Sequence, residues 1–94
     1  MPSYYPADFL RMIRNQIPIE KLIVTMLNLE VRHTSKWLRF RCPRCYNFHT
    51  ATNPATNLAR CFDCRQNFNP IDLVMAVSEY SFVEAVEYLK KRMH

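Results

Sequence analysis

Glycine is absent from this chain of 94 residues. Because glycine is the usual residue where the backbone takes a positive φ, other residues must serve at such positions in the turns. Asparagine tolerates positive φ better than most residues. We therefore expect the turns to use the asparagines that lie between or beside the predicted elements, which are Asn47, Asn53, Asn57, Asn67 and Asn69.

Long apolar runs are absent too, since none approaches the roughly 20 residues that a membrane-spanning helix needs. The N-terminal stretch MPSYYPADFLRMIRNQ also lacks the basic and then apolar parts of a secretory signal peptide. These two absences favour a cytoplasmic protein that does not enter a membrane. In a reducing compartment, paired cysteines bind metal or carry out redox chemistry more often than they form disulfides.

Acidic residues are scarce in the middle of the chain. Residues 31–66 contain seven lysines and arginines against Asp63 alone, a formal charge of +6, whereas the whole chain carries +5. Four thiolates around a divalent zinc ion would contribute −2, so some of these arginines serve to balance a metal site. The carboxylates are few, mostly in predicted helices and not paired, so the sequence predicts no catalytic residues.

All four cysteines lie within residues 40–68, in the pattern C-x2-C-x15-C-x2-C. A gap of two residues lets both sulfurs of a pair converge on one tetrahedral ion, and a loop of this length can return the second pair to the first. With four sulfur ligands no coordination position stays open, so the ion would be structural. The sequence therefore predicts one structural zinc ion bound by Cys42, Cys45, Cys61 and Cys64.

Two other uses of these cysteines remain open. A single CxxC pair on a thioredoxin-like βαβ unit could cycle between dithiol and disulfide, but here two pairs occur without a βαβ pattern. Four cysteines could also hold an iron–sulfur cluster, although the spacing does not favour one. His49 follows Cys45 by four residues and could replace a cysteine as ligand; with four sulfurs available, we expect it to be a strand residue.

Hydrophobic periodicity predicts an α+β fold, in which a small antiparallel zinc-ribbon sheet is flanked by short N-terminal and C-terminal helices. We expect helices over residues 7–16, 19–29, 71–80 and 82–92 and strands over 35–42, 47–52 and 57–62, all within one domain of residues 1–94. Asn69-Pro70 and the Ser81–Glu84 capping box predict the starts of the last two helices. Phe62 and Phe68 are expected in the core.

The first predicted strand has one basic face. Alternation directs Leu38, Phe40 and Cys42 to one side and Trp37, Arg39 and Arg41 to the other. Cations that follow phosphates beside an aromatic ring that stacks on a base suit single-stranded nucleic acid. Trp37 could instead cap the core. The candidate DNA-binding residues are Arg32, Lys36, Trp37, Arg39, Arg41, Arg44, Arg60 and Arg65.

The cysteine segment and its flanks resemble the N-terminal zinc-binding domain of bacterial (DnaG-type) DNA primases. The resemblance covers nearly the whole chain and rests on IRNQIPIEKLIVTMLNLEVRHTSKWLRFRCP, on the CFDC motif and on NPIDLVMAVSEYSFVEAVEYL, with its Ser-Phe-x-Glu-Ala turn. It implies a domain that engages single-stranded template DNA during RNA primer synthesis in replication. It also implies a primosome setting, with a primase catalytic domain or a replicative helicase as a partner.

The chain departs from the family pattern at several positions. Cys45 stands where the family usually has histidine as second ligand, and Arg65, Asn67 and Phe68 replace glycines beside the last knuckle. No segment of these 94 residues resembles the catalytic domain, so the resemblance does not imply that they join nucleotides. The alternative function is a zinc-ribbon adaptor that binds other proteins in a replication or mobile-element complex.

Overall fold

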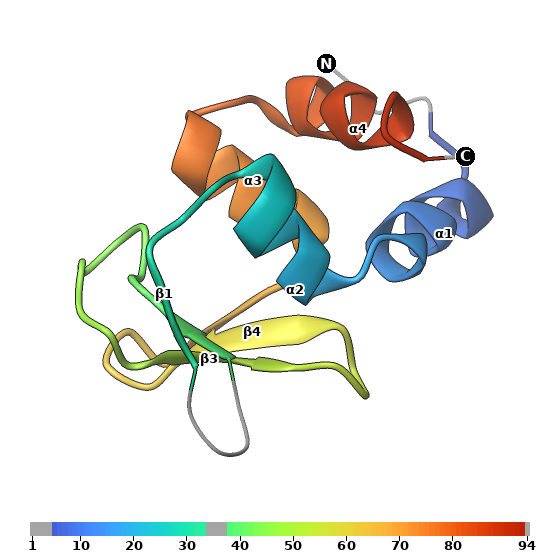
Figure 1. The fold of residues 1–94 in the computed structure, drawn as a ribbon. Coiled ribbons are helices and arrows are strands. Elements are labelled where there is room, and N and C mark those ends of the chain that lie inside the picture. Colours follow the sequence, from blue (N-terminus) through green and yellow to red (C-terminus); the bar gives the residue numbers. More distant parts are fainter. Residues whose placement is uncertain (1–4, 34–37, 94) are drawn as a thin grey trace.

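The computed structural model describes residues 5–33 and 38–93. Within them the chain forms helices at both ends of the sequence and five short strands between them (Figure 1). In chain order the elements are α1 (Ala7–Gln16), α2 (Ile19–Lys21), the π-helical turn η1 (Leu22–Met26), β1 (Val31–His33), β2 (Leu38–Phe40), β3 (Thr50–Asn53), β4 (Leu58–Cys61), β5 (Gln66–Phe68), α3 (Pro70–Ser78) and α4 (Phe82–Lys90). The α+β class is as predicted.

The five strands form one antiparallel sheet in the order β1-β2-β3-β4-β5, so each strand pairs with its neighbour in sequence. The helices gather on one side of this sheet (Figure 1). Because side chains alternate along a strand, one face of the sheet is turned toward the helices and the other away from them. We call these the inner face and the outer face.

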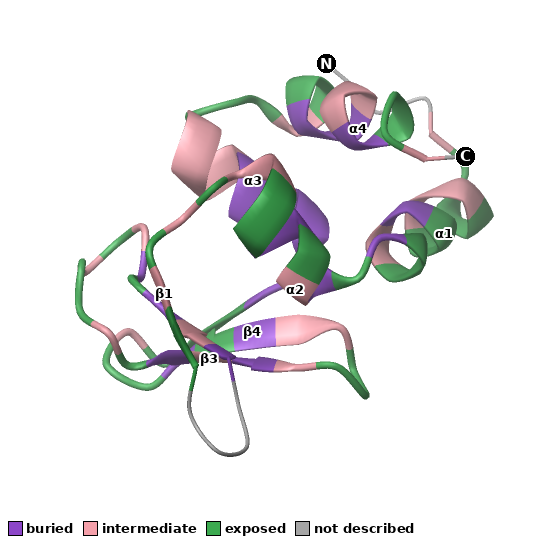
Figure 2. Ribbon diagram, viewed as in Figure 1, coloured by how far each residue is buried: buried purple, intermediate pink, exposed green. Residues whose placement is uncertain are grey.

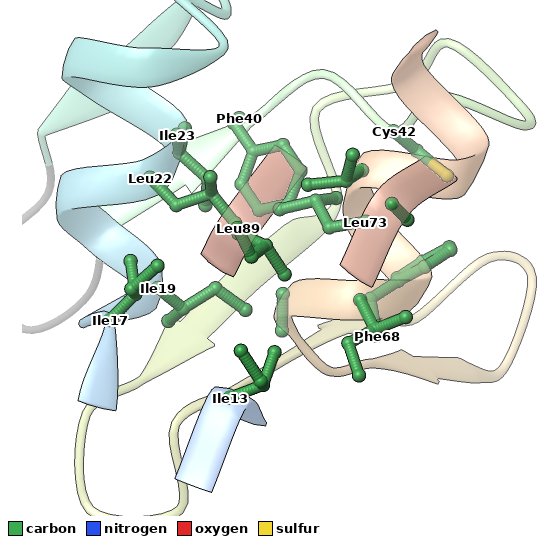
Figure 3. Close-up of a cluster of buried hydrophobic side chains, with 14 of the residues drawn as sticks. Ile13, Ile17, Ile19, Leu22, Ile23, Phe40, Cys42, Phe68, Leu73 and Leu89 are labelled. Atoms are coloured by element: carbon green, nitrogen blue, oxygen red, sulfur yellow. The ribbon is translucent and has the colours of Figure 1, made fainter. Parts of the chain in front are cut away.

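The core lies between the helices and the inner face. Buried segments occur in both the helices and the strands (Figure 2). Phe40 from β2 and Phe68 from β5 lie among apolar side chains of the helices (Figure 3), and Ala59 from β4 is buried in the same cluster. The helical contribution includes the buried residues Ile13, Ile19, Leu22, Ile23, Leu73, Val74, Val86 and Leu89. Fully burying one such side chain is worth about 1.5–3 kcal/mol. This packing fixes the inner face and leaves the outer face without a covering layer from the described residues.

Both predicted helix starts are confirmed. The Asn69 side chain accepts a hydrogen bond from the N–H of Asp72, whose carboxylate accepts one from the N–H of Asn69. Ser81 and Glu84 form the same reciprocal pair at the start of α4. Each box satisfies two backbone donors that a helix start leaves free.

The second helix is shorter than its predicted span of residues 19–29. It begins at Ile19 after Pro18, passes into the π-helical turn and ends at Met26. Asn28 then takes a φ of 52°, a left-handed conformation that stops the helix. The apolar residues that follow, Leu27 and Leu29, still pack on the core.

The prediction about asparagine and positive φ is only partly correct. Of the five asparagines named, Asn57 alone has a positive φ in the described residues. The others use their side chains differently: Asn53 accepts a hydrogen bond from the N–H of Ala55, and Asn69 caps α3. The remaining left-handed positions in the described chain are Asn28, Tyr46, Arg65 and Glu79.

Asn57 joins the β3–β4 hairpin to the N-terminal helices. Its Oδ1 accepts a hydrogen bond from the N–H of Ile19 at 2.8 Å. Its Nδ2 donates to the carbonyl oxygens of Arg14 at 2.6 Å and Ile17 at 2.9 Å. One side chain therefore satisfies three backbone groups where α1 ends and α2 begins.

No helix in residues 5–33 and 38–93 is long and apolar enough to cross a membrane.

Candidate metal centre and nucleic-acid interface

The four cysteines converge at one end of the sheet. Cys42 follows β2 by two residues, and Cys61 is the last residue of β4. Their partners Cys45 and Cys64 lie in the turns after them. We call the two turns, residues 42–45 and 61–64, the first and second knuckles. The four sulfur atoms all lie within 4.8 Å of one another.

The spacing of the sulfurs fits a zinc ion. The Sγ atoms of Cys42 and Cys64 are 3.8 Å apart, and those of Cys45 and Cys61 are 3.6 Å apart. A tetrahedral ion with Zn–S bonds of about 2.3 Å places its ligands about 3.8 Å apart. These separations are also too long for a disulfide bond, whose sulfurs lie about 2.05 Å apart. The four cysteines are therefore positioned to bind one zinc ion, as the sequence predicts.

Backbone N–H groups point at one sulfur in each knuckle. The N–H of Arg44 lies 3.4 Å from Cys42 Sγ, and that of Cys64 lies 3.3 Å from Cys61 Sγ. Burial opposes ionisation of Cys61, but the N–H of Cys64 and the neighbouring side chains outweigh it and lower the pKa of Cys61 to about 6. The interaction with Cys45 and burial raise the pKa of Cys64 to about 12. Zinc requires thiolates, so its binding displaces the thiol protons.

His49 is not part of the sulfur cluster. Its Nδ1 lies 2.6 Å from Oδ2 of Asp63, and the same carboxylate oxygen accepts a hydrogen bond from Asn47 at 3.1 Å. Asp63 lies in the second knuckle, so these contacts tie it to the segment that follows the first knuckle. His49 precedes β3 by one residue, so the strand position predicted for it is wrong by one residue.

Three arginines stand in one row across the outer face. Arg32 is opposite Arg39, Arg39 is opposite Ala51, Ala51 is opposite Arg60, and Arg60 is opposite Asn67. Neighbouring strands are about 4.8 Å apart, so the row spans the five strands. We call this set, Arg32, Arg39, Ala51, Arg60 and Asn67, the outer row. The sequence did not predict the row, because β1 and β5 were not recognised as strands.

Arg32 and Arg41 enclose one aromatic ring. Their guanidinium carbons lie 4.1 Å and 4.5 Å from the centre of the Phe48 ring. Arg41 also pairs with Glu30 at 3.2 Å and donates to the carbonyl oxygen of Tyr46 at 2.7 Å. Arg41 therefore links Glu30, the residue before β1, to Tyr46, the residue after the first knuckle.

Arg39 and Arg60 have fewer internal partners. Among the described residues, the Nε of Arg39 is buried and has no hydrogen-bond partner. Arg60 donates one hydrogen bond, from Nη1 to Oδ1 of Asn67 at 3.3 Å. A hollow of about 320 Å³ opens on the outer face, and Arg39, Ala51, Arg60 and Phe62 are among its lining residues.

Phe62 does not lie in the core. Its side chain is 57% exposed, so the expected core position is wrong, whereas Phe68 is buried as expected. Alternation along β4 explains the difference. Ala59 and Cys61 face inward, so Arg60 and the next residue, Phe62, face outward.

The remaining DNA-binding candidates lie elsewhere. Arg44 lines a separate hollow of about 570 Å³ beside α3. Asp72 and Glu79 are also among the lining residues of this hollow. Arg65 is exposed and holds a φ of 56° directly after the second knuckle. The predictions for Lys36 and Trp37 fall outside the described residues.

Comparison with known proteins agrees with this geometry. The family model described as the CHC2 zinc finger, the zinc ribbon of DnaG, matches residues 5–94. The crystal structure of the Aquifex aeolicus primase (zinc binding and RNA polymerase domains) shares the fold with a TM-score of 0.76 at 23% sequence identity. That match covers 95% of this chain and 22% of the Aquifex chain. No curated protein matches the sequence.

The family model covers nearly all of the chain, and its zinc-ribbon description agrees with the four converging sulfurs. The name CHC2 refers to a histidine among the ligands, a position that Cys45 fills in this sequence. Sulfur and imidazole nitrogen are both common zinc ligands, so the exchange preserves a tetrahedral site. The chain belongs to the CHC2 zinc finger family, the zinc-ribbon domains of DnaG-type primases.

Proposed function

We propose that this zinc ribbon binds single-stranded DNA with the outer face of its sheet and engages the template during RNA primer synthesis. The outer row is the observation that supports this function. It presents Arg32, Arg39 and Arg60 on a surface without a covering layer from the described residues, beside the exposed ring of Phe62. Cations along a groove and an aromatic side chain are what unpaired strands require.

The zinc ion has a structural part in this function. It would join the first knuckle, which follows β2, to the second knuckle, which ends β4. Arg39 and Arg60 belong to these two strands, so zinc fixes the relative position of the two cations. The ion would also contribute to folding directly, since zinc-finger peptides gain on the order of 10–16 kcal/mol on binding.

The family suggests the setting of this activity. We propose that the chain acts in the cytoplasm, in a primosome, alongside a primase catalytic domain or a replicative helicase. One zinc-ribbon domain spanning residues 1–94 is sufficient for the binding step in this proposal. The nucleotidyl transfer itself would belong to the catalytic domain.

Fluorescence anisotropy with labelled single-stranded DNA, measured at several salt concentrations, tests this function. We expect saturable binding by the zinc-loaded protein, with log K falling by about 0.7 per phosphate contacted for each unit of log salt. Absence of binding at low salt would contradict the proposal and favour the adaptor function.

A further inference from the structure

We propose that the hollow between Arg39 and Arg60 is a subsite for one unpaired nucleobase of the bound strand, which stacks on Phe62 and is preferentially guanine. This inference rests on the proposed function and specifies which contact the outer face makes with a base. Its elements are the gap over Ala51, the exposed ring of Phe62 and the side chain of Arg39, all three of which line the hollow.

Ala51 creates the gap. It stands between Arg39 and Arg60 in the outer row, and each arginine is one strand away from it. The two arginine backbones are therefore roughly 10 Å apart. A methyl side chain leaves the space between the two guanidinium groups open. The resulting hollow of about 320 Å³ lies at the small end of the ~300–1,000 Å³ range of ligand sites, which suits one base.

Phe62 supplies an aromatic surface at this hollow. The backbone of Phe62 is held in place in two ways. Phe62 lies between the zinc ligands Cys61 and Cys64, and its N–H donates to the carbonyl oxygen of His49 at 3.0 Å. The ring nevertheless remains 57% exposed. An aromatic side chain held by the backbone at a rim, and left uncovered, is suited to stack on a flat ligand.

Arg39 gives the subsite its preference. Its Nε is the buried side-chain nitrogen that lacks a partner in the described part of the chain, and an unsatisfied buried donor costs about 1–3 kcal/mol. Because this nitrogen is closed to solvent, a base in the hollow would be contacted by the two terminal nitrogens of the Arg39 side chain, which lines the hollow. Arginine pairs in two-pronged fashion with O6 and N7 of guanine, whereas the pyrimidines offer no such pair of acceptors.

The test uses short strands of abasic residues that carry one base at the centre, either guanine, cytosine or none. We expect the zinc-loaded protein to bind the guanine strand about 5- to 150-fold more tightly than the strand without a base. Phe62→Ala should remove most of that gain, so that this variant binds the guanine strand and the strand without a base with similar affinity. Phe62→Trp should retain it.

Tyr46→Ala is the matched control. Tyr46 directly follows the first knuckle, and 65% of it is exposed. It does not line the hollow. Its removal should leave the gain from the base unchanged. Zinc content and the thermal unfolding curve of each variant establish that folding is intact. Equal gains in wild type and Phe62→Ala would overturn the subsite, while salt-dependent binding of the strands would still support the proposed function.

Arg39→Lys tests the preference separately. Lysine keeps the charge but lacks the planar fork of donors, so guanine should lose its advantage over cytosine. An unchanged preference would overturn the contact from Arg39.

The last experiment measures the binding of free guanosine monophosphate. If it binds as tightly as the guanine strand and its binding depends on Phe62, the hollow is a site for free nucleotides, which would overturn a subsite for a base of the strand.

Discussion

Arg39 and Arg60 lie on opposite sides of Ala51, each paired with it across the sheet from a different strand. The two residues are far apart in sequence and belong to strands that lead into different knuckles. Any ligand that contacts both guanidinium groups must therefore depend on the sheet being intact, and hence on the metal that joins the knuckles.

Removing the two cations should weaken DNA binding without unfolding the protein. The variant Arg39→Ala/Arg60→Ala should lose affinity for single strands and show a smaller salt slope, since each phosphate contact that is lost lowers the slope by about 0.7. Anisotropy titrations over a salt series measure both. Arg11→Ala/Arg14→Ala, which removes the same charge from α1, is the control and should leave the slope nearly unchanged. Equal effects of the two double variants would mean that only net charge matters.

Removing zinc should unfold the ribbon. The four sulfurs are the ligands, and apparent binding free energies on the order of 10–16 kcal/mol exceed the stability that a core of this size supplies. Chelation should therefore abolish the native circular dichroism spectrum, and added zinc should restore it with one ion bound per chain. A native spectrum retained after exhaustive chelation would show that the metal is dispensable for folding.

Asn57 should be a sensitive position for stability. Asn57→Gly keeps access to the φ of 56° but removes three hydrogen bonds, which predicts a loss of roughly 1.5–4.5 kcal/mol in the free energy of unfolding. Asn57→Ala should cost about 1 kcal/mol more, because alanine resists that conformation. Urea unfolding measures both values. Asn15→Ala, which removes one exposed hydrogen bond to Arg11, is the control and should cost much less.

Glu79 offers a stabilising substitution. It ends α3 with a φ of 55°, a conformation that costs a residue with a side chain about 1–2 kcal/mol. Glu79→Gly should raise the free energy of unfolding by about 1 kcal/mol relative to Glu79→Ala, which removes the same carboxylate but not the strain. Thermal denaturation of the two variants provides the comparison. A lower stability of the glycine variant would contradict the assignment of strain at this position.

The features that could be predicted from the sequence are those encoded by neighbouring residues. The cysteine spacing, the Asn69-Pro70 helix start, the capping box of α4 and the amphipathic helix α1 were recognised because each is encoded within a few neighbouring residues. β1 and β5 were missed because each has three residues and polar side chains on its outer face. Such short strands form because their neighbours in the sheet offer hydrogen-bond partners, which a single sequence does not reveal.

The wrong position of Phe62 has a different cause. Apolar residues usually lie in the core, but this rule fails for individual residues, because the strand register decides which face of the sheet a side chain occupies.

Tyr46 and Arg65 hold left-handed conformations because each directly follows a knuckle. In a chain without glycine, the closure of the metal site imposes these conformations on residues that do not favour them.

The most direct test of the central claim, that the outer face of the zinc-held sheet binds single strands, is a titration of the isotopically labelled protein followed by amide chemical shifts. A short single strand added at low salt should shift the amides of Arg39, Ala51, Arg60, Phe62 and Asn67 and leave those of α1 and α4 in place. Shifts confined to the helices, or no shifts at all, would contradict the account.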